Sequence, residues 1–102
     1  MKIDKKSITM AVKTGKVVIG SKQVVHVLLN ENPKLILLSS NCKPNIRDRI
    51  TYYAHLAKVP CHTVNFTGIE LGSICGKPFT ISSLAILNPG DSNILDLVGH
   101  NG

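Results

Sequence analysis

The chain has 102 residues, of which 43% are hydrophobic and 18% are charged, and its formal net charge is +6. This length fits one domain with a modest core, and no apolar run approaches the ~20 residues of a membrane-spanning helix. The first six residues lack the apolar stretch of a secretory signal, and three cysteines without C-x-x-C spacing argue against a disulfide framework or a zinc site. We therefore expect one intracellular domain, residues 1–102, with reduced thiols and neither cofactor nor metal.

Positive charge is concentrated in the first part of the chain. Residues 1–58 hold eleven of the twelve Lys and Arg against three carboxylates, whereas residues 59–102 hold one Lys against three carboxylates. Such asymmetry is the electrostatic footprint of a nucleic-acid binder, although many basic surfaces serve only solubility. Charge alone leaves both interpretations open.

A helix, a strand and a second helix are expected before residue 34. Asp4 can cap a first helix that ends at Gly15, and residues 16–19 form a strand pattern that Gly20 stops. Ser21 is the expected N-cap of the next helix. Its β-branched valines compete for a strand, but a helix is needed between two adjacent strands, and we keep the helix.

Residues 34–58 carry the clearest pattern, a strand, a loop and a helix without a gap. Residues 35–38 are apolar on both faces, which is typical of a central strand between two helical layers. Ligands of open α/β sheets collect beyond the carboxyl ends of strands. Asn41 and Lys43, in a loop without a carboxylate, therefore indicate an anionic or nucleobase ligand there.

The remaining elements continue the alternation. Residues 59–64 are expected to form a strand, and Thr67 with Glu70 forms a capping box for a helix that Gly76 ends. A loop at 77–80, a last strand within 81–87 and a final helix after 88–91 complete the chain. This order predicts a three-layer α/β/α domain of the α/β class with a four-stranded sheet.

Two other patterns suggest ligands. Residues 15–22 nearly spell a phosphate-binding P-loop, but Lys and Ser stand in the wrong order and a strand occupies the loop, so we reject nucleoside triphosphate binding. Gly20 and Ser21 still begin a helix whose free N–H groups, with Lys22, can accept a phosphate, although most such starts only cap the helix. Phe79 follows a Lys-Pro loop and can stack on an unpaired base, or it can fold onto the edge of the core.

No catalytic set emerges. The four histidines lack metal-ligand spacing, and Cys42 has no assigned base to activate its thiol. We expect a protein that is not an enzyme.

The chain resembles the archaeal and eukaryotic large-subunit ribosomal proteins called L-thirty-e, in the group of kink-turn RNA binders, almost from end to end. The segments that carry this resemblance are Thr14-Gly15-Lys16 with Gly20-Ser21-Lys22, Lys34-Leu35-Ile36 with Asn41, Tyr52-Tyr53-Ala54, Glu70-Leu71-Gly72, Cys75-Gly76-Lys77-Pro78-Phe79, and Pro89-Gly90-Asp91-Ser92 followed by Ile94-Leu95.

The resemblance implies an α/β/α sandwich around a four-stranded mixed sheet, with RNA gripped by three neighbouring loops at one end. The RNA-binding residues implied are Gly20, Ser21 and Lys22 at the start of the RNA-facing helix, Asn41 and Lys43 in the loop after the central strand, and Lys77, Phe79, Thr80 and Ile81 at the third contact.

We therefore expect a cytoplasmic constituent of the large ribosomal subunit that binds a kink-turn or internal loop of ribosomal RNA. It would be a monomer when free, with neighbouring ribosomal proteins as further candidate partners and no membrane association. One alternative is a kink-turn binder of a ribonucleoprotein outside the ribosome. The other is a small ligand-binding or enzymatic domain that uses the crevice around Asn41 and Cys42.

Overall fold

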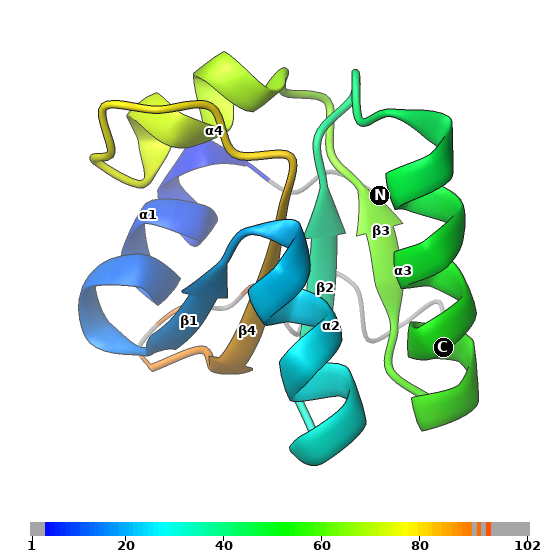
Figure 1. The fold of residues 1–102 in the computed structure, drawn as a ribbon. Coiled ribbons are helices and arrows are strands. Elements are labelled where there is room, and N and C mark those ends of the chain that lie inside the picture. Colours follow the sequence, from blue (N-terminus) through cyan, green and yellow to red (C-terminus); the bar gives the residue numbers. More distant parts are fainter. Residues whose placement is uncertain (1–3, 91, 93, 95–102) are drawn as a thin grey trace.

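The computed structural model describes residues 4–90, 92 and 94, in which helices and strands alternate (Figure 1). The elements are α1 (Lys5–Thr14), β1 (Lys16–Ile19), α2 (Ser21–Asn30), β2 (Leu35–Leu38), α3 (Pro44–Ala57), β3 (Cys61–Thr63), α4 (Gly68–Ile74) and β4 (Ser83–Asn88). The final helix expected after 88–91 falls almost wholly outside the described residues. Among the described helices, none is long and apolar enough to span a membrane.

The four strands form one mixed sheet in the order β1-β4-β2-β3. Strand β4 runs antiparallel to both β1 and β2, whereas β2 and β3 are parallel. From the sequence we predicted that β1 and β2, the two strands joined by α2, are adjacent in the sheet. This prediction is wrong, because β4 lies between them. As a result, the carboxyl ends of β1, β2 and β3 meet the start of β4 at one edge of the sheet.

Helices cover both faces of the sheet, which confirms the three-layer prediction (Figure 1). Ile8 of α1 and Leu71 of α4 pack in one core with Leu37 of β2. Val24 of α2 and Ile50 of α3 pack in the other core. All four residues of β2 are buried and alternate between the two cores, as the apolar run 35–38 predicted.

Two predicted helix starts are confirmed. The Asp4 carboxylate accepts a hydrogen bond from the Ser7 N–H at 2.8 Å, and α1 ends at Gly15. Thr67 and Glu70 form both bonds of the capping box at α4, and this bonding lowers the pKa of the Glu70 carboxyl. Asp4 has a lowered pKa for the same reason, its bonds to Ser7.

The predicted N-cap of α2 is wrong by one residue. Gly20 is the N-cap, with φ of +102°, and Ser21 is the first helical residue. The Gly20 N–H also bonds to the Ser83 carbonyl, which holds Gly20 in a conformation that residues with a side chain rarely adopt. The Ser21 hydroxyl instead lies 3.4 Å from the Ser83 hydroxyl.

Strand β3 is shorter than the predicted 59–64. Pro60 has no N–H to donate, although its carbonyl still accepts a bond from Ile36 N–H at 2.9 Å. The ladder therefore begins at Cys61.

Candidate nucleic-acid interface

The three loops named in the sequence analysis lie at one edge of the sheet, where the start of β4 joins them. The first loop is residue 20 together with residues 21 and 22, which begin α2, the second is 39–43, and the third, predicted as 77–80, extends to residue 82. The Ser83 carbonyl accepts a hydrogen bond from Gly20 N–H at 3.1 Å, and the Ser82 carbonyl accepts one from Ser39 N–H at 2.9 Å. The first two loops are thus tied to the same short stretch of backbone.

Gly68, the first residue of α4, connects the second loop to the third. Its N–H donates to Asn41 Oδ1 at 3.0 Å, and its carbonyl accepts from Ile81 N–H at 2.9 Å. Because Gly68 N–H can only donate, the Asn41 amide must present its oxygen to α4. The Nδ2 group of this exposed side chain has no partner among the described residues and is available to a ligand.

The third loop runs directly against α4 because two glycines, one turn apart, leave room for it. A Cβ at Gly68 would lie 2.4 Å from Thr80 Cγ2, and a Cβ at Gly72 would lie 2.0 Å from the Phe79 carbonyl oxygen. Lys77 N–H also donates to the Gly72 carbonyl at 2.8 Å. The loop is therefore fixed on the helix, and it presents Phe79 with 55% of its surface exposed.

The other predicted site residues differ in exposure. Lys22, Lys43, Lys77 and Thr80 are exposed, and Gly20 and Ser21 are half-buried. Ile81 is 1% exposed and packs in the core on the α1 and α4 face. A contact from Ile81 to a ligand can therefore come only from its backbone.

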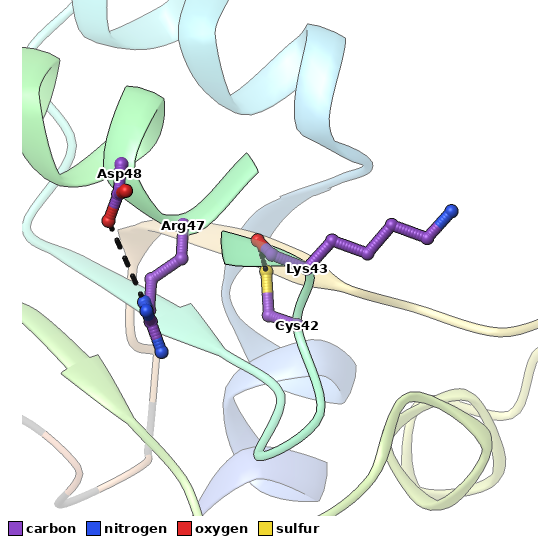
Figure 2. Close-up of polar contacts among 4 residues, drawn as sticks. All are labelled: Cys42, Lys43, Arg47 and Asp48. Carbon is purple, nitrogen blue, oxygen red and sulfur yellow. Dashed lines mark hydrogen bonds and ion pairs between the residues drawn. The ribbon is translucent and has the colours of Figure 1, made fainter. Parts of the chain in front are cut away.

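Each of the three loops contributes one lysine: Lys22, Lys43 and Lys77. Figure 2 shows the Lys43 side chain extending away from Cys42 and Arg47 at the start of α3. Arg47 pairs with Asp48 at 3.8 Å, with both side chains largely exposed, so this ion pair contributes little to stability. One lysine in each loop, an exposed aromatic ring in the third and a free amide donor in the second suit a polyanion with accessible bases.

Comparison with known proteins shows the family of this chain. The model of the ribosomal protein L7Ae/L30e/S12e/Gadd45 family matches residues 2–96. The chain belongs to this family. A relative from Methanothermobacter thermautotrophicus, named large ribosomal subunit protein eL30, is 46% identical over 99 residues, covering 97% of this chain and all of the relative.

Two further archaeal relatives bear the same name. The protein from Methanococcus vannielii is 42% identical and covers 90% of this chain and 88% of its own length. The protein from Methanopyrus kandleri is 42% identical and covers 91% and 85%. The resemblance to L30e drawn from the motifs is thereby confirmed, and the family match spans all three loops.

Within this L7Ae/L30e-type fold, Cys42 is poorly suited to act as a nucleophile. Its side chain is buried, and burial raises the pKa of the thiol, so the thiolate needed for attack is scarce at neutral pH. Burial also raises the pKa of Cys61 and Cys75. Among the described residues no cluster of His, Cys, Asp or Glu could hold a metal ion.

Gly68 and Gly72 also shape this site, although neither was predicted from the sequence to do so. Glycine is unfavourable within a helix by about 1 kcal/mol relative to alanine, so two glycines in the short helix α4 indicate a close packing contact. Their spacing of one turn was the available signal that a backbone crosses one face of this helix.

Proposed function

We propose that this protein is a non-catalytic, structural constituent of the large ribosomal subunit that binds a kink-turn or similar internal loop of ribosomal RNA. The observation that carries the proposal is the bonding of the Gly68 peptide to Asn41 on one side and Ile81 on the other. These two hydrogen bonds tie the second and third loops to the same residue. The relatives named eL30 support the ribosomal role, which places the protein in the cytoplasm within the ribosome.

The three loops divide the recognition of RNA between them. Lys22, beside the exposed N–H groups at the start of α2, meets a phosphate. Asn41 Nδ2 donates to an acceptor on a base edge, and Phe79 stacks on a base that the internal loop leaves unpaired. Lys43 and Lys77 add positive charge in the second and third loops. Recognition therefore requires a bent RNA with unpaired bases, rather than a continuous helix.

The surface that binds RNA is complete within one chain, so we infer a monomer in the absence of RNA. Neighbouring ribosomal proteins are further partners in the assembled subunit. The alternative of an enzyme that uses Asn41 and Cys42 is disfavoured, because the Asn41 oxygen is engaged by Gly68 and the Cys42 thiol is buried.

Titration against two RNAs tests the proposal. One carries a kink-turn, and the other has the same length and ends but a fully paired helix in place of the internal loop. At one salt concentration we expect binding to the kink-turn RNA at least about 100-fold tighter, within the range by which specific binding usually exceeds non-specific binding. Equal affinity for both RNAs would refute recognition of the internal loop.

A further inference from the structure

Helices α2 and α3 lie side by side on one face of the sheet, and both begin at the edge that carries the loops (Figure 1). Lys22 on α2 and Arg49 on α3 stand on opposite sides of the seam between them, and neither forms an ion pair with another described residue. A hollow of about 60 Å³ lies in the seam at this end, lined by Ser21, Lys22, Val25, Ile46, Arg49 and Ile50.

Two exposed leucines continue this seam away from the loops. Leu29 follows Lys22 by seven residues, and Leu56 follows Arg49 by seven residues. Seven residues are about two turns of an α-helix, so each leucine lies on nearly the same side of its helix as the cation before it. Because the two helices run in the same direction, Leu29 and Leu56 line the far end of the seam. They are 62% and 60% exposed.

Tyr52 widens this apolar surface on α3. It precedes Leu56 by four residues, so the two side chains are neighbours on the helix, and it is 60% exposed. Its ring meets the ring of Tyr53 edge-on, with 5.4 Å between centroids, and Tyr53 packs against the core. Three of the five large hydrophobic side chains that are exposed in the described part of the chain thus lie on α2 and α3.

This surface is also free of charge beyond the hollow. Residues 23–30 of α2 and 50–57 of α3 contain no Lys, Arg, Asp or Glu, although the whole chain has a net charge of +6. RNA would find no cation there to neutralise its phosphates. Exposed tyrosine and leucine with few charges are instead typical of the centre of a protein–protein interface. The composition therefore favours a protein over RNA as the occupant.

We propose that the α2/α3 seam, formed by Lys22, Leu29, Arg49, Tyr52 and Leu56, binds an amphipathic helical segment of a neighbouring protein in the large subunit. Apolar side chains of that segment cover the two leucines and the tyrosine, as in other helices that dock in grooves. A carboxylate at one end pairs with Arg49, which complements the two cations of the hollow.

A second copy of this chain fits the seam less well, because it would bring a further net charge of +6 to the contact. The inference rests on the proposed function, and it assigns to the partner protein a surface that the three RNA-binding loops do not use.

Photo-crosslinking in assembled large subunits tests this contact. A phenylalanine that carries a diazirine, whose carbene inserts into protein and RNA alike, replaces Leu29, Leu56 or, as a control, the exposed Lys13 on α1. Mass spectrometry identifies what is linked after irradiation. Positions 29 and 56 should link to the same segment of one protein, with apolar residues at helical spacing and an Asp or Glu, and position 13 should not link to it.

Other crosslinking results overturn the inference. These are links from positions 29 and 56 to RNA, to a second copy of the chain or to unrelated segments, the absence of any link at both positions, and a linked segment without a carboxylate.

The linked segment is then made as a synthetic peptide and titrated against the purified protein. We expect Leu56→Ser and Tyr52→Ser each to bind it about fivefold or more weakly than wild type, because each loses apolar contact area. Ile69→Ser removes an exposed apolar side chain from α4, outside the seam, and should bind as the wild type does. No binding to the wild-type protein, or unchanged affinity of Leu56→Ser, contradicts docking in the seam.

Titrations with kink-turn RNA separate this inference from the proposed function. Leu56→Ser and Tyr52→Ser should bind that RNA as the wild type does, and a loss of RNA affinity would assign the seam to RNA instead. If wild-type protein prefers kink-turn RNA over the paired helix but the crosslinks fail, only the docking surface is lost. If wild-type protein shows no such preference, the proposed function itself fails.

Discussion

Asn41 Oδ1 accepts a 3.0 Å hydrogen bond from the N–H of Gly68, a residue 27 positions further along the chain. This bond gives one side chain two separable tasks. Its oxygen fastens the second loop to the start of α4, and its Nδ2 group, without a partner among the described residues, can donate to a ligand. Substitutions that remove one task and keep the other can therefore distinguish folding from binding.

Asn41→Asp keeps an oxygen for Gly68 N–H but removes the Nδ2 donor and adds a negative charge. We expect the affinity of Asn41→Asp for kink-turn RNA to fall to the level of non-specific binding. The free energy of unfolding should change by less than about 1 kcal/mol at this exposed site. Asn41→Ala should lose both functions and be destabilised by about 0.5–1.5 kcal/mol. Urea melts and RNA titrations check both variants, and tight binding by Asn41→Asp would contradict the role of the amide donor.

Gly72→Ala should destabilise the protein and weaken RNA binding together. The new methyl group would lie 2.0 Å from the Phe79 carbonyl oxygen, a backbone atom that cannot move without shifting the third loop. Overpacking of this kind costs about 1–3 kcal/mol, which exceeds the gain of about 1 kcal/mol from better helix propensity. Ser73→Ala, on the exposed side of α4, is the control for unfolding and should stay within about 0.5 kcal/mol of wild type. A more stable Gly72→Ala would show that the loop is not held against the helix.

The two phenylalanines provide a matched comparison. Phe79 is 55% exposed and lies outside both cores, whereas Phe66 packs against the core on the α1 and α4 face. Phe79→Ala should weaken RNA binding about five- to 150-fold, the range for loss of one stacked base, and change the unfolding free energy by less than about 1 kcal/mol. Phe79→Tyr should retain most of the affinity.

Phe66→Ala should do the reverse, with a loss of stability of up to about 3–5 kcal/mol and unaltered affinity of the folded fraction. Urea melts and RNA titrations of both alanine variants decide the assignment. A large destabilisation by Phe79→Ala without loss of affinity would place its ring among the structural residues.

Lys22→Ala tests the phosphate contact of the first loop, because the loss of such a contact changes how steeply the affinity for RNA falls with salt concentration. Each neutralised phosphate contributes roughly 0.7–0.9 to the slope of log affinity against log salt concentration. We expect Lys22→Ala to lower that slope by about one unit. Lys34→Ala makes the same change in net charge, but Lys34 directly precedes β2 and lies at the end of this strand opposite the second loop. It should therefore leave the slope unchanged. Equal slopes for Lys22→Ala and wild type would remove Lys22 from the interface.

Local sequence patterns were enough to predict most of the elements, and the structure brings the three predicted loops to one edge of the sheet. The apolar run 35–38 and the capping box of Thr67 with Glu70 each depend on neighbouring residues, so the sequence alone indicated them. The order of strands was not predictable in this way, because β4 pairs with strands far away in the sequence. The contact of Asn41 with Gly68 was missed for the same reason.

The central claim is that the three loops form one RNA-binding surface, and amide chemical shifts of ¹⁵N-labelled protein test it most directly. On addition of kink-turn RNA, we predict that the largest shifts occur at Gly20, Asn41 and Phe79, one residue from each loop. Amides at the opposite end of the sheet, such as Glu31 and Lys34, should remain unperturbed. Large shifts confined to that opposite end, with the three loops unchanged, would contradict the account.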